Sequence, residues 1–223
     1  MKILALDTSA KAASVALCEV EKLLALDTLN IGLTHSETML PMIESLLSSS
    51  KTDISDIDLF ACSAGPGSFT GLRIGVSVIK GLAFGKNKIC VGVSTLEALA
   101  RNISFADDNA LVCPVMDARR NQVFCALFRI ESGKPVRLLP DDTKDASELA
   151  SMLGKTGKNV YFVGDGYDMM KKMNLPFALE TPEILRYQNG YSVAMTALDR
   201  YNAVPDKADF TDLLLSPEYL RPS

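Results

Sequence analysis

Glycine is concentrated in one stretch of the chain, residues 59–85, and this stretch restricts the possible folds most. It holds six of the fourteen glycines and only two charged side chains. The pattern predicts a strand over 59–64, a tight turn at 65–67 and a helix over 72–84. Because a glycine inside a helix costs about 1 kcal/mol relative to alanine, we expect a neighbouring backbone to lie very close to this helix.

The turn at residues 65–67 has two interpretations. The free N–H groups at the start of the following helix could bind an anion such as a phosphate. Alternatively, the glycines let the strand and the helix pack closely, with no ligand involved. A Walker-type phosphate loop is excluded, because no Gly-Lys-Ser/Thr follows the turn.

The two halves of the chain share one order of predicted elements. In the first half we expect strands over 2–6, 13–20, 23–29, 59–64 and 88–93 and helices over 34–47, 72–84 and 95–102. In the second half we expect strands over 111–116, 123–130, 135–139 and 160–163 and helices over 147–153, 167–173 and 192–201. In each half the first strand ends in an aspartate, Asp7 or Asp117, followed by a turn and a second strand.

This repeated order indicates a duplicated α/β protein with two lobes, each a mixed sheet flanked by helices. The actin-like ATPase (ASKHA) fold has this organisation. A polar break at residues 103–109 predicts an N-terminal lobe over 1–105 and a C-terminal lobe over 106–223. In such proteins the aspartate after the first strand lies near phosphate and metal.

Charge and composition exclude several classes of protein. The chain of 223 residues has a net charge of −4, so we do not expect it to bind tRNA or DNA tightly by itself. It has no signal-peptide core and no apolar run long enough to span a membrane, and we expect it in the cytosol. The number of cysteines is odd and none shows Cys-x-x-Cys spacing, which predicts buried free thiols at Cys18, Cys62, Cys90, Cys113 and Cys125.

Five segments together resemble the bacterial TsaB (YeaZ) family of tRNA threonylcarbamoyladenosine biosynthesis proteins. The most specific is Ala64-Gly65-Pro66-Gly67-Ser68-Phe69-Thr70-Gly71-Leu72-Arg73-Ile74-Gly75. The others are Ile3–Ser9, His35-Ser36-Glu37 with Leu40-Pro41, Met116–Arg120 and Pro217–Arg221. They follow in the family's order along the whole chain.

The resemblance implies a non-catalytic scaffold that activates TsaD, a catalytic paralogue with the same fold. TsaD transfers a threonylcarbamoyl group to the adenosine beside the anticodon of tRNAs that read codons starting with A. TsaE, an ATPase, completes the assembly, and tRNA would be bound only through the complex. No cofactor is implied for this chain.

The residues around the first strand indicate a degenerate phosphate site without catalysis. Its members would be Asp7, Thr8, Ser9 and Asp117. TsaD-like enzymes hold a metal with a His-x-x-x-His pair, whereas His35, the one histidine, is followed four residues later by Met39. A two-histidine metal site is therefore impossible. Asp7 and Asp117 alone could hold a hydrated Mg²⁺, which needs few protein ligands, but we predict no metal. The alternative function is an ATP-dependent phosphotransferase or a glycoprotease-like enzyme of the same superfamily.

Two predicted helices, over 34–47 and 72–84, carry the apolar residues that we expect to form one partner surface. The same surface would form a homodimer when the catalytic paralogue is absent, because a large apolar patch seldom stays exposed. The predicted surface residues are Met39, Met42, Ile43, Leu46, Gly71, Ile74, Gly75, Val78 and Leu82. The C-terminal residues 216–222 should form an extended strap, whose packing partner the sequence leaves open.

Overall fold

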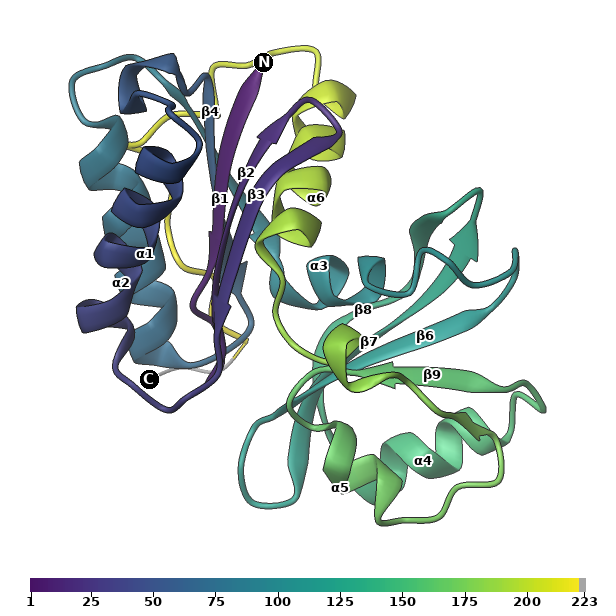
Figure 1. Ribbon diagram of the computed structural model, residues 1–223. Coiled ribbons are helices and arrows are strands. Elements are labelled where there is room, and N and C mark those ends of the chain that lie inside the picture. Colours follow the sequence, from purple (N-terminus) through teal and green to yellow (C-terminus); the bar gives the residue numbers. More distant parts are fainter. Residues whose placement is uncertain (221–223) are drawn as a thin grey trace. The chain divides into compact units, whose positions relative to one another are not determined.

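A five-stranded mixed sheet lies at the centre of the first half of the chain (Figure 1). Its strands are β1 (Lys2–Asp7), β2 (Ala13–Glu19), β3 (Lys22–Leu29), β4 (Leu59–Gly65) and β5 (Ile89–Ser94). The structure, a computed structural model, describes residues 1–220. The first three strands form an antiparallel meander, as predicted, and β4 and β5 extend it in parallel to give the order β3-β2-β1-β4-β5.

Helices cover both faces of this first sheet. Helices α1 (His35–Ser49) and α2 (Phe69–Ala83) pack on one face, and α6 (Gly190–Ala203) packs on the other (Figure 1). Successive side chains of a strand point to opposite faces. The even-numbered apolar residues of β1 therefore join the core beneath α1 and α2, and the odd-numbered ones join the core beneath α6.

The second sheet repeats the topology of the first. Its strands are β6 (Leu111–Asp117), β7 (Gln122–Glu131), β8 (Lys134–Asp145), β9 (Val160–Val163) and β10 (Ala178–Leu179). Strands β6 to β8 form an antiparallel meander, and β9 and β10 add in parallel on the other side of β6. The remaining helices are α3 (Thr95–Arg101), α4 (Ala146–Gly154), α5 (Tyr167–Lys171) and the short 3-10 helices η1 (Ile54–Asp56) and η2 (Glu183–Leu185). The duplicated α/β architecture predicted from the order of elements is confirmed.

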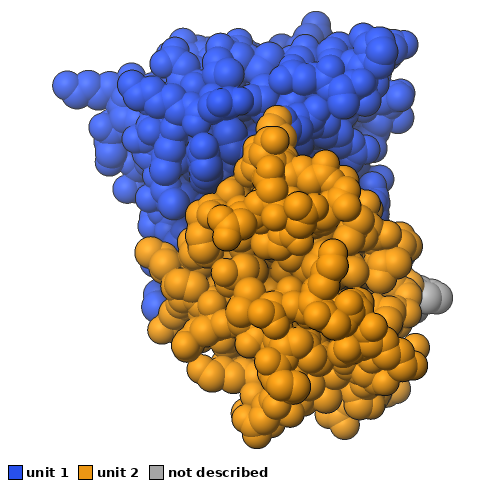
Figure 2. Space-filling view, turned by 90° about the vertical axis from the view of Figure 1, so that its right-hand side faces the viewer, with its two compact units in different colours: residues 1–98, 188–219, 223 blue, residues 99–187, 220–222 orange. Residues whose placement is uncertain are grey.

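The two units are not divided where the sequence suggested. One unit contains residues 1–98 together with 188–219, and the other contains residues 99–187 (Figure 2). The prediction placed everything after residue 105 in the second lobe. Instead, α6 and the C-terminal segment return to the first unit, because the apolar face of α6 completes the core on that side of the first sheet. Arg221 of the C-terminal motif lies outside the described residues.

Two helix starts differ in detail from the prediction. Helix α2 begins at Phe69, three residues earlier than predicted, because Ser68 acts as its N-cap and its Oγ accepts a hydrogen bond from the Gly71 N–H at 3.3 Å. Thr34 is the N-cap of α1, as predicted, but its side chain makes no capping hydrogen bond. Thr34 and Glu37 have the Thr-x-x-Glu spacing that predicts a capping box, and the Thr34 side-chain half of that motif is not formed.

Two glycines of α2 provide a matched test of the close approach. A Cβ on Gly71 would overlap the backbone carbonyl of Thr8, whereas a Cβ on Gly81 would meet no atom within 4 Å. We expect Gly71→Ala to lower the free energy of unfolding by about 3 kcal/mol through this clash. Gly81→Ala should raise it by up to about 1 kcal/mol through helix propensity. Urea denaturation of both variants measures the difference, and equal effects would contradict the close contact.

Candidate functional site

The turn after β1 holds a buried carboxylate that is bonded to its own chain. Asp7 is 1% exposed. Its Oδ1 accepts hydrogen bonds from the Ser9 N–H at 2.8 Å and the Ser9 Oγ at 2.6 Å, and its Oδ2 accepts one from the Ser63 Oγ of β4 at 2.5 Å. Burial raises the pKa of Asp7 above its ordinary value, and the hydrogen bonds from Ser63 and Ser9 lower it in part.

The start of α2 lies directly against this turn. Thr8 Oγ1 donates a hydrogen bond to the Gly71 carbonyl at 2.8 Å, and the Ser68 N–H donates one to the Ser9 carbonyl at 2.7 Å. A Cβ on Gly67 would lie 2.6 Å from the Ser9 carbonyl oxygen. The polar groups of the turn that would face a phosphate are therefore bonded to the glycine-bearing end of α2. Of the two interpretations of residues 65–67, this geometry favours close packing.

The single histidine fastens α1 to the same region. His35 is the first residue of α1, and its Nε2 lies 2.6 Å from the Ala10 carbonyl oxygen. A carbonyl oxygen only accepts, so Nε2 carries the proton in this bond. The ring therefore ties the first turn of α1 to the loop between β1 and β2.

The fourth predicted member of the degenerate site belongs to the other unit. Asp117 ends β6 and is exposed. Its Oδ1 accepts a hydrogen bond from the Arg119 N–H at 2.7 Å, and its own N–H donates to Asp165 Oδ1 at 3.1 Å. Asp7, Thr8 and Ser9 lie together, whereas Asp117 stabilises a separate turn. Within residues 1–220 no group of three His, Cys, Asp or Glu side chains is arranged to hold a metal ion.

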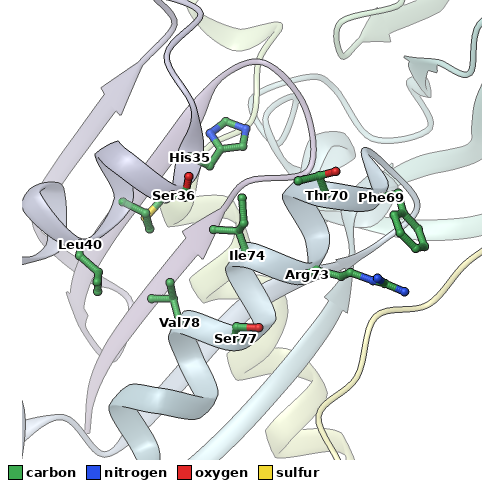
Figure 3. A pocket seen from close by; sticks show the side chains of 10 residues that line it. His35, Ser36, Leu40, Phe69, Thr70, Arg73, Ile74, Ser77 and Val78 are labelled. Carbon is green, nitrogen blue, oxygen red and sulfur yellow. The ribbon is translucent and has the colours of Figure 1, made fainter.

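A hollow of about 420 Å³ lies between α1 and α2 (Figure 3). It is lined by His35, Ser36, Met39, Leu40, Phe69, Thr70, Arg73, Ile74, Ser77 and Val78. Leu40 and Phe69 are among the exposed large apolar side chains of the chain, at 46% and 38%. Neither residue is among the surface residues predicted from the sequence. The sequence signal for Leu40 is its helical spacing: it lies four residues after Ser36, on the same side of α1. The signal for Phe69 is its place on the outward side of α2.

Most of the predicted partner-surface residues belong to the core of the first unit. Met39, Met42, Ile43 and Leu46 are at most 5% exposed and pack against the first sheet. Gly71 and Gly75 are buried against the Thr8 backbone and side chain. Their helical spacing places these residues on one side of each helix, and that side faces the sheet. The half-buried members of the predicted set are Ile74, Val78 and Leu82.

The C-terminal segment packs on its own unit, beside α2. The Glu218 N–H donates to the Ala64 carbonyl at 2.7 Å, and Leu215 is buried in the core beneath α1 and α2. Tyr219 packs against Phe69 with ring centroids 5.0 Å apart. The strap therefore covers the side of α2 away from α1.

The five cysteines are all buried and unpaired, as predicted. Burial raises the pKa of each thiol, to about 12 for Cys18 and about 11 for Cys90. None of the helices in the described part of the chain is long and apolar enough to cross a membrane.

Comparison of the sequence with known proteins identifies the family. Residues 31–205 match the family model of TsaD, tRNA N6-adenosine threonylcarbamoyltransferase. The chain is 33% identical over 173 residues to the TsaB protein of Bacillus subtilis, covering 78% of this chain and 75% of that protein. It is 39% identical over 134 residues to TsaB of Escherichia coli, covering 60% of this chain and 58% of that protein.

Comparison of the structure with solved structures agrees. A Pseudomonas aeruginosa protein described as similar to the peptidase YeaZ superposes with a TM-score of 0.80 at 25% identity, over 99% of both chains. The activator of 2-hydroxyisocaproyl-CoA dehydratase from Clostridium difficile, solved with bound ADPNP, gives a TM-score of 0.52 at 12% identity over 91% of this chain and 96% of that one, a likeness of fold alone. The two mixed sheets with flanking helices are those of the actin-like ATPase fold, and the chain belongs to the TsaB (YeaZ) family of tRNA threonylcarbamoyladenosine biosynthesis proteins.

Proposed function

We propose that this protein is a non-catalytic subunit that binds and activates a TsaD-like catalytic paralogue. In this proposal it works with a TsaE-like ATPase in the cytosol. The complex transfers a threonylcarbamoyl group to the adenosine next to the anticodon of tRNAs that read codons starting with A. The membership of the TsaB family supports a role in this modification.

The single observation that supports a non-catalytic role is that the chain's own hydrogen bonds and the backbone of α2 fill the turn after β1. In proteins of the actin-like fold that use ATP, this turn faces the nucleotide phosphates. In this chain Asp7 accepts hydrogen bonds from Ser9 and Ser63, and the backbone of α2 lies against Thr8 and Ser9. A phosphate placed there would have to displace the start of α2.

The alternative of an ATP-dependent phosphotransferase also needs an adenosine-binding segment in the second lobe. The sequence offers only residues 163–166 for this purpose. Gly164 and Gly166 are packed against the backbone of β6 at Val115, so a Cβ at Gly164 would overlap the Val115 carbonyl. This packing accounts for the glycines as a tight turn and counts against the alternative. The glycoprotease alternative lacks a usable histidine, since His35 is bonded to the Ala10 carbonyl.

The hollow between α1 and α2 supports the choice of partner face. Leu40, Phe69, Ile74 and Val78 give it apolar walls from both helices. Exposed apolar surface of this kind marks sites of protein–protein interaction. We assign the catalytic paralogue to this face, with a second copy of the chain in its place when the paralogue is absent.

The deciding experiment is a tRNA modification assay with purified catalytic paralogue and ATPase, with and without this chain. Co-purification of the chain with each candidate partner accompanies the assay. We expect modified adenosine to form only in the complete mixture. Equal modification without this chain would reject the proposed function.

Asp7→Asn tests the structural role assigned to the carboxylate. The folded chain binds the Asp7 proton more tightly than the unfolded chain, because burial raises the pKa above 3.8. As the pH rises above 3.8, the unfolded form ionises first and the wild-type free energy of unfolding falls. We expect the variant, which cannot ionise, to gain stability relative to wild type between pH 4 and pH 7, as measured by urea denaturation.

The control for this variant is Asp53→Asn. Hydrogen bonds from Ser55 lower the pKa of Asp53. The contribution of Asp53 to the free energy of unfolding is therefore lost as the pH falls, which is the opposite pH dependence to that of Asp7. ATP hydrolysis is measured in the same samples. Turnover in the wild type that disappears in Asp7→Asn would contradict the non-catalytic role.

Ile74→Glu tests the partner face. Ile74 is half-buried and lines the hollow, so an ionised carboxylate there would be buried without a partner after docking. We expect loss of binding to the catalytic paralogue, with an unchanged circular dichroism spectrum. The matched control is Ile184→Glu in η2, an 85% exposed position in the other unit, which should bind normally. Normal binding by Ile74→Glu would place the interface elsewhere.

The net charge generates a prediction about tRNA. With a formal charge of −4 the lone chain gains little from the release of counterions. We expect no tRNA binding by the lone chain at micromolar concentration and 150 mM salt, and binding once the catalytic paralogue is added. Filter binding with labelled tRNA measures both. Tight binding by the lone chain would refute the assignment of tRNA contacts to the complex.

A further inference from the structure

The hairpin turn between β6 and β7 presents two neighbouring arginines to the solvent. Arg119 and Arg120 are both exposed. Among the described residues, neither guanidinium has an ion pair, a hydrogen-bond partner or an aromatic ring beside it. Both cations are therefore available for an anion from outside the chain, and the proposed function gives them no role.

The backbone of this turn is strained. Arg119, Arg120 and Asn121 have φ angles of +64°, +55° and +61°, in a region that L side chains seldom adopt. Asparagine is tolerated there because its short side chain can bond locally, whereas arginine has no such compensation. Strain of this kind persists where the surrounding structure holds it, and it is concentrated at functional sites. The turn therefore points to a role beyond the stability of the hairpin.

Hydrogen bonds within the second unit hold the strained turn in place. The Arg119 N–H donates to Asp117 Oδ1 at 2.7 Å, and the Asp117 N–H donates to Asp165 Oδ1 at 3.1 Å. The Asn121 carbonyl accepts a hydrogen bond at 3.0 Å from the N–H of Ala146, the first residue of α4. Two carboxylates and a helix thus fix the backbone, and the guanidiniums take no part. A turn that is already ordered loses little conformational entropy when a ligand binds.

The first unit has a turn of the same geometry at the equivalent place in its own sheet. Asp7 accepts a hydrogen bond from the N–H two residues later, that of Ser9, as Asp117 does from Arg119. Ser9 is buried against the start of α2, a helix of 15 residues, whereas α5, the helix in the corresponding position of the second unit, has five. The duplication therefore leaves the second turn uncovered, with a cation at the position of Ser9.

The chemistry of the turn favours a phosphate group of RNA over a protein partner. None of the exposed large apolar side chains of the described chain lies within residues 117–122. Protein interfaces have an apolar, well-packed centre, whereas contacts to a nucleic-acid backbone consist of charged and polar groups on phosphate. The planar guanidinium binds a phosphate through two parallel hydrogen bonds. Two neighbouring arginines thus offer two such contacts.

We propose that Arg119 and Arg120 bind phosphate groups of the tRNA backbone once this chain is part of the modification complex. This rests on the proposed function, which brings tRNA to the complex. Two phosphate contacts are too few to overcome the net charge of −4 in the lone chain, which agrees with the expected absence of tight tRNA binding by that chain. Contacts of this kind position the tRNA and do not read its sequence.

The test is the salt dependence of tRNA binding by the complex of this chain with the catalytic paralogue, measured by filter binding. The variant is Arg119→Gln with Arg120→Gln, which removes both charges. Each phosphate contact contributes about 0.7–0.9 to the slope of the logarithm of the affinity against the logarithm of the salt concentration. We expect the slope to fall in magnitude by about 1.4–1.8, and the affinity at about 150 mM salt to fall about tenfold.

Arg120→Gly separates this role from a structural one. Glycine adopts a φ of +55° without strain, so the variant should unfold at a higher urea concentration than the wild type. We expect the same variant to bind tRNA more weakly in the complex, with the slope reduced by about 0.7–0.9. A lower urea midpoint together with unchanged tRNA binding would assign Arg120 to the fold alone and overturn its contact with RNA.

The matched control is Lys155→Gln with Lys158→Gln. These two exposed cations lie beyond the far end of α4, and their loss changes the net charge by the same amount. The control should keep the wild-type tRNA affinity and slope. An equal change in the control would reduce the effect to net charge and overturn the proposed contact.

Two further outcomes overturn the RNA contact and leave the proposed function standing. One is a wild-type slope in the complex that carries Arg119→Gln with Arg120→Gln. The other is failure of this double variant to co-purify with the catalytic paralogue, because the turn would then be a protein contact. A wild-type mixture that neither binds nor modifies tRNA rejects the proposed function, and the RNA contact with it.

Discussion

The contact between the turn after β1 and the first turns of α2 determines the rest of the first unit. Gly67 and Gly71 let the backbone of α2 approach the carbonyls of Ser9 and Thr8, and Gly75 leaves room for the Thr8 side chain. The cost is about 1 kcal/mol for each glycine within the helix. It is offset by burial of the large apolar side chains of α2 on the sheet, about 1.5–3 kcal/mol each. The glycines thus lower the helix propensity of α2 but allow it to pack very close to β1.

This contact has two consequences that are physically linked. The turn that could receive a phosphate is occupied by the chain's own hydrogen bonds, which leaves Asp7 as a buried structural acceptor. At the same time the close contact and the Thr8–Gly71 hydrogen bond hold α2 against the turn after β1, and Ile74 and Val78 of α2 line the hollow. A rigid surface binds a partner with a smaller entropy loss than a mobile one.

Much of the fold was predictable because local patterns determine it. The short apolar strands, the turn residues between them and the change to helical spacing after Thr34 correspond to elements that the structure contains. The place of α6 was not predictable, because helical periodicity shows that a helix has an apolar face without showing which sheet it covers. Its return to the first sheet depends on a core that strands far away in the sequence create.

At the candidate site, too, the sequence shows that each helix has an apolar side without showing what that side packs against. The spacing of Met39, Met42 and Leu46 is equally suited to a core and to a partner surface, and only the sheet beneath α1 decides for the core. The residues that line the hollow, such as Leu40 and Ile74, turn away from that sheet. The glycines that made the sequence distinctive act beneath this surface. They determine how closely α2 packs on the turn after β1. This distance in turn determines how far Arg73 and Phe69 project beside the C-terminal strap. The motif at residues 64–75 therefore serves both sides of one helix: its glycines pack against the turn after β1, and its Phe69, Arg73 and Ile74 line the hollow.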